Sequence, residues 1–545
     1  MKQRIFPASI VLLILGVACR PVSGGRPPVA PSPTPVATPV TTPVTTTGAI
    51  TPASDGTTTA PTVPAVAPSP VGEAGAPVFD VSPGDLGIFS TGLVAAEQAT
   101  PGKLTGAPFY QIDIAIGEAM NTVTGRQVVT LTNTEDVALD EVYFHLHPRT
   151  LEGDMEVTDV VAGTGADAVA VEAVAEGDVL RVPLPAPLAP GESVTLSMNF
   201  ETTVPTDIGR NYGVLAYYED ILALAHFYPM LAVYDDEGWN IAEPDVQGDL
   251  TYGDAALFVT RVTAPDDVIL VASGAAVEQS AGDGTQTITY AAGPARDFFL
   301  AAGDFEVVSR TVGETTIHSY APADRVDGAA AALDVAAVAL ADYSERLGPY
   351  PYTELDIVTT PTSALGIEYP GIIVGTLGMY DVEATTQGGI PLRAILESTT
   401  AHEVAHQWFY NLVGNDQLDE PWLDEAVVSY TTYRYFVERY GQRAADSYFE
   451  TFFGRWERAD MDEIPVGLPV ADYDGAEYSA IVYGRGPIFL RELEETIGRE
   501  TFDAFLSDYA GRFRWAIADA AAFRDLAEEH CACDLGPLFA EWVTG

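Results

Sequence analysis

Short runs in which apolar and polar residues alternate occupy the chain from residue 109 to about residue 312, with Gly, Pro, Asn and Asp between them. The clearest runs are residues 127–133, 141–147, 179–184, 193–200 and 256–262. Alternation with a period of two is typical of strands that bury one face, and many short strands separated by turns form a sheet domain or sandwich. We therefore predict an all-β N-terminal domain, a saddle or sandwich, over residues 108–312.

The spacing of apolar residues changes near residue 313. Residues 327–347 are rich in alanine and helical in pattern, residues 355–359 have the pattern of one strand, and helical spacing dominates from Arg393 to Trp542. Such periodicity predicts a mostly helical domain. We predict that this domain spans residues 313–545, which makes the chain an α+β multidomain protein.

The first nineteen residues follow the order of an export signal. Lys2 and Arg4 precede an apolar stretch from residue 10 to residue 17, and Ala18 and Cys19 end the segment. A cysteine after small residues resembles a bacterial lipoprotein cleavage site, which implies a signal peptide over residues 1–19 and lipidation of Cys19. An ordinary cleaved signal, in which Cys19 is incidental, is the alternative.

Residues 20–107 are predicted to form a disordered tether rich in Pro, Thr and Ala. Residues 20–78 contain no Phe, Trp or Tyr, so this stretch has little to bury. No later segment reaches the roughly 18 apolar residues that a membrane-spanning helix needs. We expect a bacterial cell-envelope lipoprotein that faces outside the cytoplasm and meets the membrane only through its lipidated N-terminus. A fully secreted protein is the alternative.

The charge of the chain narrows the choice of partners. Its 78 acidic residues outnumber its 26 basic ones and give a formal net charge of −52. Proteins that bind nucleic acids need a basic face to displace counterions from the phosphates. The composition therefore argues against a nucleic-acid partner.

Two histidines occur at a spacing that suits a metal ion. His402 and His406 lie four residues apart in a segment of helical apolar spacing, which we expect to be entered through the caps Ser398 to Thr400. Both rings then project from one helix face and are able to bind one ion. Glu403 is rotated by about 100° around the axis, so it is placed to act on a water molecule at the metal. Two packed core histidines are the structural alternative.

A third ligand is expected from the next helical segment, which opens at Pro421. Eighteen residues separate His406 from Glu425, and an antiparallel helix would bring Glu425 back over the two histidines. Two histidines and one glutamate with an open fourth position make a catalytic zinc site, so we expect one zinc ion per chain. Asp424 is a rival ligand, and either acid is also explained by the helix dipole alone.

Together these residues carry a family resemblance. The segment from His402 to Phe409 and the sequence from Trp422 to Glu425 resemble the gluzincin aminopeptidases related to aminopeptidase N, which combine HExxH with a later Glu in a WLNEG-like motif. The resemblance implies a saddle-shaped β domain followed by a thermolysin-like zinc peptidase domain. The chain ends soon after Trp542, so we expect a short form without the C-terminal helical domain and with a more open cleft.

The same resemblance implies two further site regions. Tyr483 falls where the family has a tyrosine that donates a hydrogen bond to the developing oxyanion. Gly366 and Glu368 fall where the family has its GAMEN-type loop, which implies substrate binding, with Glu368 as the anchor of the α-amine. Without the resemblance, Tyr483 is more typical of a core residue and Glu368 of solvated surface.

The predicted function is that of a zinc metallopeptidase which removes N-terminal residues from peptides or oligopeptides, with Glu403 as the general base. One alternative is a zinc endopeptidase or oligopeptidase in which Glu368 has no role. The second is a catalytically silent, peptide-binding lipoprotein. Cys531 and Cys533 are interpreted as a disulfide or two inert thiols rather than a metal site. The remaining histidines are interpreted as packing or surface residues: His145, His147, His226, His318 and His530. For His226, which lies beside Phe227, a position facing the substrate is the alternative.

Overall fold

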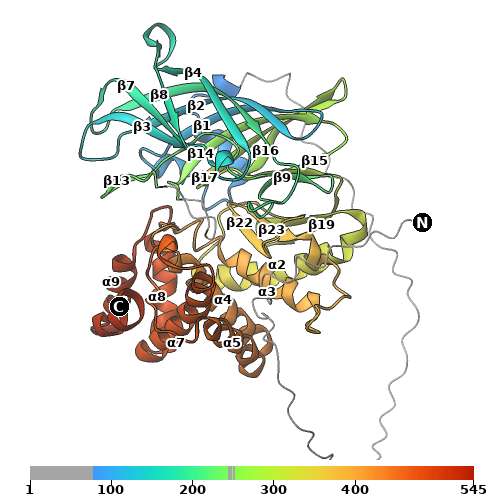
Figure 1. Cartoon of the computed structure of the whole chain (residues 1–545), viewed down its shortest axis with the longest axis vertical. Helices are drawn as coiled ribbons and strands as arrows, with labels where there is room; N and C mark the ends of the chain where they lie inside the picture. The colour runs from blue at the N-terminus through green and yellow to red at the C-terminus, as the bar shows by residue number, and fades with distance from the viewer. Residues whose placement is uncertain (1–77, 243–247, 249–251) are drawn as a thin grey trace, which may run out of the picture. The chain divides into compact units, whose positions relative to one another are not determined.

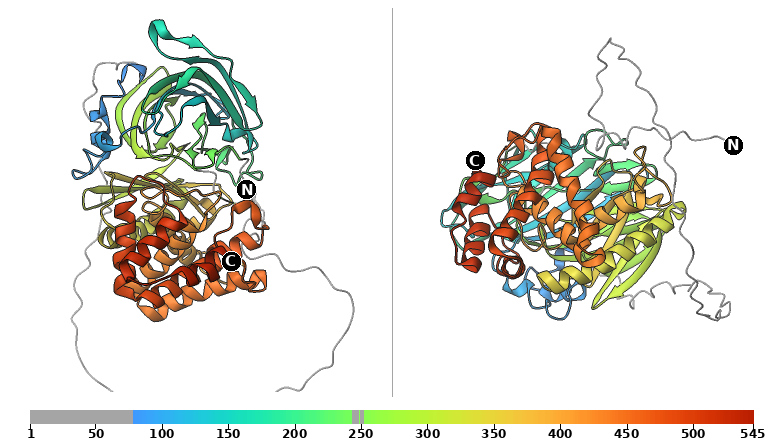
Figure 2. Two further views of the ribbon diagram at one scale, coloured as in Figure 1. Left: turned by 90° about the vertical axis from the view of Figure 1, so that its left-hand side faces the viewer. Right: turned by 90° about the horizontal axis from the view of Figure 1, so that it is seen from below.

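The structure is a computed structural model that describes residues 78–242, 248 and 252–545. Its strands come mostly first in the chain and its helices mostly last (Figure 1), and Figure 2 gives two further views. This order confirms the predicted α+β class. The predicted signal peptide, with Cys19, and residues 20–77 of the predicted tether lie outside the described residues.

The largest sheet of the β-rich part has eight strands in the order β16-β17-β14-β1-β2-β8-β4-β5. At its centre, β1 (Phe109–Ile116) is parallel to β14 (Ala256–Pro265) and antiparallel to β2 (Thr122–Thr132). Every second residue of β2 from Gln127 to Leu131 is buried, as the alternation predicts. The other strands are β4 (Asp154–Ala162), β5 (Val169–Ala170), β8 (Ser193–Thr203), β16 (Ala275–Gly282) and β17 (Thr285–Ala295).

Two four-stranded sheets share a hydrophobic core with this large sheet. Core residues come from all three sheets, for example Ile112, Phe144 and Leu222. One sheet has the order β15-β18-β10-β9, with β15 (Ile269–Ala272), β18 (Leu300–Gly303), β10 (Ile221–Leu224) and β9 (Leu215–Tyr218). The other has the order β11-β3-β7-β6, with β11 (Met230–Leu231), β3 (Leu139–His145), β7 (Val179–Leu188) and β6 (Val174–Glu176).

A mixed five-stranded sheet begins the second part of the fold. Its order is β19-β20-β21-β23-β22, with β19 (Glu306–Val312), β20 (Thr315–Ala321), β21 (Glu354–Thr360), β23 (Ile372–Thr376) and β22 (Gly366–Tyr369). Helix α2 (Val326–Leu347) packs on β19 and β20, and helix α3 (Leu392–Ala405) packs on β22 and β23. Because α2 and α3 also contact each other, they form one helical layer against the sheet.

The rest of the described chain is helical. Helix α4 (Trp422–Tyr440) contacts α3, α5 (Gln442–Trp456) and α7 (Gly486–Ile497), and α8 (Arg499–Arg512) contacts α7 and α9 (Ala520–Cys531). Shorter elements are α6 (Glu477–Ala480), the π-helical turn η10 (Ile481–Arg485), α10 (Gly536–Phe539) and η11 (Ala540–Thr544). Within the described ranges, no helix has both the length and the apolar run that crossing a bilayer requires.

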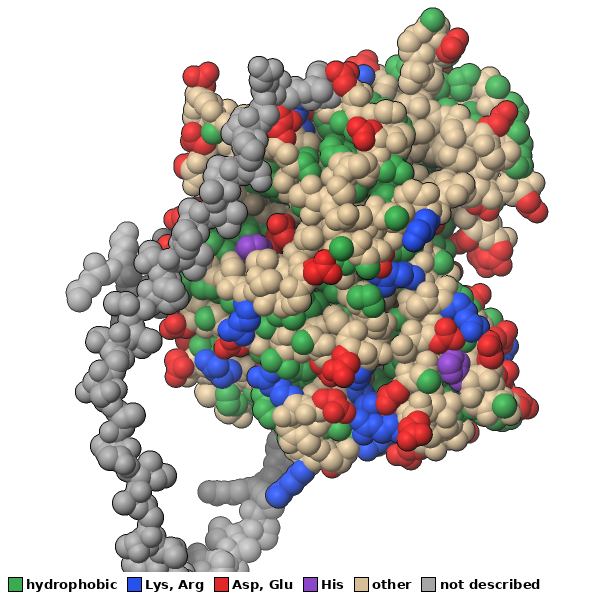
Figure 3. All heavy atoms as spheres, turned by 180° about the vertical axis from the view of Figure 1, so that it is seen from behind, with side chains coloured by type: hydrophobic (Ala, Val, Ile, Leu, Met, Phe, Trp, Pro, Cys, Tyr) green, Lys and Arg blue, Asp and Glu red, His purple; other side chains and the backbone are tan. Residues whose placement is uncertain are grey.

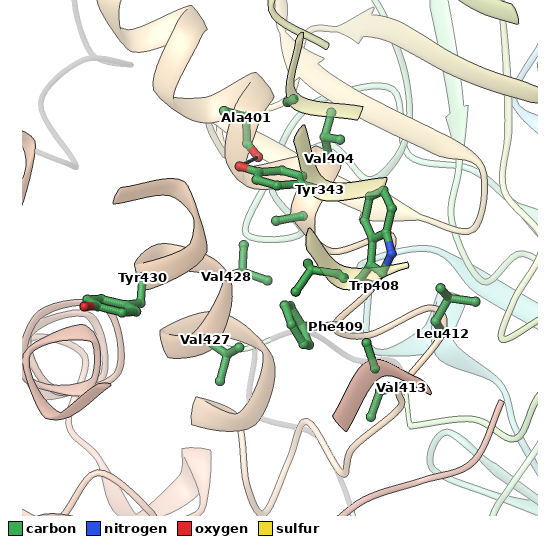
Figure 4. Packing of buried hydrophobic residues seen from close by; sticks show 14 of the residues in the cluster. Tyr343, Ala401, Val404, Trp408, Phe409, Leu412, Val413, Val427, Val428 and Tyr430 are labelled. Atoms are coloured by element: carbon green, nitrogen blue, oxygen red, sulfur yellow. Dashed lines mark hydrogen bonds between the residues drawn. The ribbon is translucent and has the colours of Figure 1, made fainter. Parts of the chain in front are cut away.

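The core of the helical part forms around the end of α3 (Figure 4). Trp408 is fully buried, its indole donates a hydrogen bond to the Gly348 carbonyl at 2.9 Å, and its ring meets Tyr343 edge-on. The Tyr343 hydroxyl donates to the carbonyl of Ala401 at 3.0 Å. Burial of large aromatic side chains contributes much of a core's free energy, so these contacts hold α3 firmly in place.

Residues 78–107 differ from the prediction, which assigned them to the disordered tether. They form the short helices η1 (Val78–Asp80), η2 (Leu86–Gly92) and η3 (Pro101–Lys103). Phe89 is buried and packs edge-on against Phe109, and Leu93 is buried in the same cluster. The tether prediction is therefore wrong here, because this interval, unlike residues 20–77, contains phenylalanine and leucine side chains that a core is able to bury.

The predicted domain boundary at residue 312 falls inside a hairpin. Strand β19 pairs with β20, with Val312 opposite Thr315. Strand β18 belongs instead to a sheet of the β-rich part. The change from one set of sheets to the other therefore lies between β18 and β19, and the two parts remain in one compact unit.

Charged side chains are spread over the face shown in Figure 3, where acidic groups are interspersed with basic ones. Several arginines form ion pairs with acids, such as Arg434 with Glu494 at 2.7 Å. No basic face of the kind that nucleic-acid binding requires is visible in this view.

Arg296 connects the β-rich part to the helical part. Its guanidinium is buried, and its hydrogen bonds within the described residues go to backbone carbonyls at distances between 2.6 and 3.4 Å, those of Gly253, Tyr410, Asn411, Leu412 and Ala516. Burial lowers the pKa of Arg296, and the nearby charge of Asp254 opposes that shift. The guanidinium thus fastens the loop after α3 to the β-rich part.

Replacing Arg296 with alanine should destabilise the fold strongly, because buried carbonyl oxygens lose their donor. We expect the free energy of unfolding to fall by about 3 kcal/mol in urea denaturation. Arg310→Ala is the matched control, since Arg310 pairs with Asp334 at the surface and should contribute less than about 1 kcal/mol. Equal effects of the two variants would show that Arg296 does not connect the parts.

Candidate metal centre

His402 and His406 lie at the C-terminal end of α3. The helix begins at Leu392, so the residues expected as its cap, Ser398 to Thr400, lie inside it, and that detail of the prediction is wrong. His402 is in the last turn, and the N–H of His406 bonds back to the His402 carbonyl at 3.3 Å. The two ring centroids are 4.8 Å apart, so both rings lie on the same side of the helix end.

Glu425 reaches the same point from the first turn of α4. The fully buried ring of Trp422 fixes the start of this helix by packing edge-on against Phe489 and Phe523. Glu425 Oε2 lies 3.1 Å from His402 Nε2 and 3.6 Å from His406 Nε2. The structure therefore brings together the three predicted ligands, with side chains from two helices.

The spacing of these three atoms fits a tetrahedral zinc ion. The two Nε2 atoms are 3.2 Å apart, which completes a triangle with sides of 3.1, 3.2 and 3.6 Å. Ligands bound at the usual zinc distances of 2.0–2.1 Å stand about 3.3 Å apart in a tetrahedron. His406 Nδ1 donates a hydrogen bond to the Phe409 carbonyl at 3.1 Å, which leaves the Nε2 lone pair for a metal.

The electrostatics of the site also call for a cation. Glu368, Glu403, Asp424 and Glu425 are all buried around the two histidines. Burial raises the pKa of Glu403 well above its usual value, although His406 opposes the shift. Burial acts to lower the pKa of His406, but Glu368 and Glu425 outweigh it and hold this pKa well above the usual value. A metal ion would take the place of that proton on His406.

Asp424, the rival ligand, is directed to other partners. Its Oδ2 accepts a hydrogen bond from Gln417 Nε2 at 2.6 Å, and its Oδ1 accepts one from the backbone N–H of Glu425 at 2.7 Å. Burial raises its pKa to about 7, and the neighbouring Glu425 adds to the rise. Although Asp424, Glu368 and His406 are also close enough to share an ion, we assign the third ligand of the site to Glu425.

Strand β22 places Gly366 and Glu368 beside the histidines. A Cβ atom at position 366 would overlap the carboxylate of Glu403, so glycine leaves room for that side chain. Residues two apart in a strand share a face, and Glu368 accordingly lies in the site, with its Oε2 4.0 Å from His406 Nε2. The loop implied by the resemblance is thus a strand next to α3, buried at Glu368 and Tyr369.

Tyr483 lies at the edge of the ligand set. It belongs to the π-helical turn η10, an irregularity that often marks functional sites. Its hydroxyl donates a hydrogen bond to Glu425 Oε1 at 2.5 Å, and its ring lies 6.4 Å from that of His402. The predicted oxyanion donor is therefore within reach of the ion that these ligands would hold.

Gln407 is a supporting residue that the sequence reasoning missed. Its amide Nε2 donates to the Tyr369 carbonyl at 3.0 Å, and its Oε1 accepts from the N–H of Gly371 at 2.9 Å. These bonds fasten the turn after Glu368 to the end of α3. The sequence could have indicated Gln407 through its position directly after His406, because a polar side chain there lies near the site.

A substitution at Glu425 should remove the ion, whereas one at Asp424 should not. In Glu425→Ala only two ligands remain, and we expect the zinc content after dialysis to fall by one ion per chain. Asp424→Asn keeps an acceptor for Gln417 and should retain the zinc of the unchanged protein. Loss of zinc in Asp424→Asn but not in Glu425→Ala would show that Asp424, and not Glu425, is the third ligand.

Comparison with known proteins bears on the same residues. The Peptidase family M1 domain matches residues 331–542. "Probable aminopeptidase 1" of Sulfurisphaera tokodaii is 26% identical over 254 residues, which cover 45% of this chain and 32% of that protein, so the chain spans about a third of the relative's length.

Solved structures share the fold. A mutant of the M1 zinc metallopeptidase from Deinococcus radiodurans superposes with a TM-score of 0.61 at 20% identity, over 81% of this chain and 95% of that one. A mutant of the same protein bound to a Tyr-Ser-Ala substrate gives a TM-score of 0.59 at 19% identity, over 81% and 94% of the two chains. Residues 331–542 therefore match the domain of peptidase family M1, and the chain shares the fold of the M1 zinc metallopeptidase structures.

Proposed function

We propose that this protein is a zinc-dependent aminopeptidase that removes N-terminal residues from short peptides. The observation that carries the proposal is the position of Glu368, a buried carboxylate 4.0 Å from a metal-ligating nitrogen of His406. A carboxylate at that distance suits the ammonium group of a peptide N-terminus. The ammonium nitrogen and the first carbonyl carbon are about 2.5 Å apart in a peptide, so binding at Glu368 would bring the first peptide bond to the metal site.

Each predicted residue has a position that suits its step. Zinc, when bound, supplies a Lewis acid that polarises the scissile carbonyl and lowers the pKa of a water molecule. Glu403 would accept a proton from the attacking water and pass it to the departing amine, a role that suits a carboxyl whose pKa is raised by burial. Tyr483 would donate a hydrogen bond to the developing oxyanion. Its hydroxyl would exchange the hydrogen bond with Glu425 for this one with the substrate.

The substrate class rests on the relatives as well as on the site. The Sulfurisphaera relative is named an aminopeptidase, and the Deinococcus structure is bound to a tripeptide. Both support a short peptide with a free N-terminus as the substrate of this chain. Such a substrate also suits the charge of the site, because its ammonium group would offset part of the negative charge of the buried carboxylates.

We also propose that the protein acts outside the cytoplasm, attached through a lipid on Cys19. The charged, apolar and small residues of the segment 1–19 support export. Cys531 and Cys533 form a disulfide, which is typical of proteins in oxidising compartments. The disulfide also supports one of the two interpretations of this pair that the sequence favoured.

The proposed activity is tested with paired peptides that differ only in a free or an acetylated N-terminus. We expect the free peptides to lose one residue at a time and the acetylated ones to remain intact, because acetylation removes the charge that Glu368 would bind. Glu403→Gln is the control, and it should lose turnover while it retains zinc. Internal cleavage of both peptides at similar rates would identify an endopeptidase and contradict the proposal.

Replacing Tyr483 with phenylalanine should lower kcat about a hundredfold, since a donor aimed at developing charge contributes about 3 kcal/mol. The KM should change little, because the hydroxyl acts in the transition state. Tyr478→Phe is the matched control, since its ring packs against that of Tyr483 at 5.8 Å. Near-normal turnover in the Tyr483 variant would remove this residue from the mechanism.

A further inference from the structure

A second group of histidines lies in the β-rich part, apart from the ligand set of α3 and α4. His145 ends strand β3, and His147 follows two residues later. Both are buried, and their rings are stacked with centroids 4.9 Å apart and an angle of 8° between the planes. The chain has only seven histidines, so a buried pair of them calls for a physical explanation.

Asp178 completes this group from the neighbouring strand. It directly precedes β7, whose first residue, Val179, is the register partner of His145. The N–H of Leu146 donates to the Asp178 carbonyl at 2.5 Å, and the hydroxyl of Thr150 donates to Asp178 Oδ2 at 3.1 Å. The backbone ladder and these two bonds therefore hold the carboxylate next to the histidine pair.

Both imidazoles present an unsatisfied buried nitrogen. His145 Nε2 lies 3.1 Å from the Asn240 carbonyl, to which it is able only to donate, so its Nδ1 carries the lone pair. His145 Nδ1 and His147 Nδ1 are both buried without a hydrogen-bond partner among the described residues. Buried polar atoms are rarely left unpaired in native structures, and an ion shared with the neighbouring carboxylate would satisfy both nitrogens.

We propose that His145, His147 and Asp178 bind a second divalent transition-metal ion, with zinc as the first candidate. One ring nitrogen from each histidine and one Asp178 oxygen lie within 4.8 Å of one another, a distance that small side-chain rotations would reduce to that of a bound set. Imidazole and carboxylate ligands suit zinc and its neighbours in the first transition row. Burial lowers the pKa of both histidines, which keeps their lone pairs available.

The position of this site indicates a structural role. The ion would join the end of β3 to the start of β7, both in the β-rich part. The ring of His147 lies 5.1 Å from that of His226, and His226 lies 6.3 Å from Tyr369, the neighbour of Glu368. An ion here would thus stabilise the ring contacts that connect His147, through His226, to Tyr369 of strand β22. This inference goes beyond the proposed peptidase activity and does not depend on it.

The test measures zinc per chain in the full-length protein. The protein is stripped with a chelator, reloaded with excess Zn²⁺, dialysed and assayed for zinc and protein content. We expect two ions in the unchanged protein, one in Asp178→Asn and one in His402→Ala. Asp178→Asn keeps the size of the side chain and an acceptor for Thr150, and His318→Ala, at a histidine outside both groups, is the control that should keep two ions.

Titration of the stripped, unchanged protein with Co²⁺ gives a second measurement that needs no variant. We expect visible absorption to rise until two equivalents are bound. Saturation at one equivalent of Co²⁺ would overturn the proposal. So would a zinc content of one ion in the unchanged protein and none in His402→Ala. Two ions in Asp178→Asn would overturn it as well. Because the readout is metal content, a failure of the aminopeptidase proposal would leave these outcomes unchanged.

Discussion

Two imidazoles and one carboxylate from separate helices converge at one point, and the packing of the helical part is organised around this convergence. His402 and His406 come from the end of α3 and Glu425 from the start of α4, and their ligating atoms form a triangle with sides of 3.1 to 3.6 Å. Large buried aromatic groups surround this point, with Trp408 just past α3 and Trp422 opening α4. Packing of the helices therefore prepares the geometry before an ion arrives, which reduces the cost of binding it.

The charge around this point explains why the same residues suit both a metal and a peptide N-terminus. Four carboxylates are buried close to two histidines, an arrangement that is costly unless positive charge is supplied. A divalent ion would offset two of these charges, and the substrate ammonium group that we propose would offset a third. The turn after strand β22 and the segment after α3 lie beside this point, and buried polar side chains fasten both, Gln407 the former and Arg296 the latter.

The site was more predictable from the sequence than the details of the fold. The four-residue spacing of His402 and His406 is a local property of a helix, and Glu425 followed from the length of the connection to the next helix. The start of α3 was misplaced because Ser398 to Thr400 carry the composition of a cap, whereas tertiary packing extends the helix back to Leu392. Residues 78–107 were assigned to the tether because the core that buries Phe89 and Leu93 is built largely from residues distant in sequence.

The contacts of Gly366 and Gln407 could not be predicted from the local sequence either, because their partners are also distant along the chain. Gly366 makes room for a carboxylate 37 positions later, and Gln407 bonds to a turn 36 positions earlier. Such contacts depend on how β22 and α3 meet, which no spacing in the sequence encodes. The hydrogen bond from Tyr483 to Glu425 likewise depends on the packing of η10 against α4.

Anomalous scattering from crystals of the zinc-loaded protein, recorded on both sides of the zinc absorption edge, would locate the ion itself. The proposed ligand set requires a peak at 2.0–2.1 Å, the usual zinc distance, from the Nε2 atoms of His402 and His406 and from a carboxylate oxygen of Glu425. Absence of a peak between these three residues, with Glu425 turned toward other partners, would contradict it.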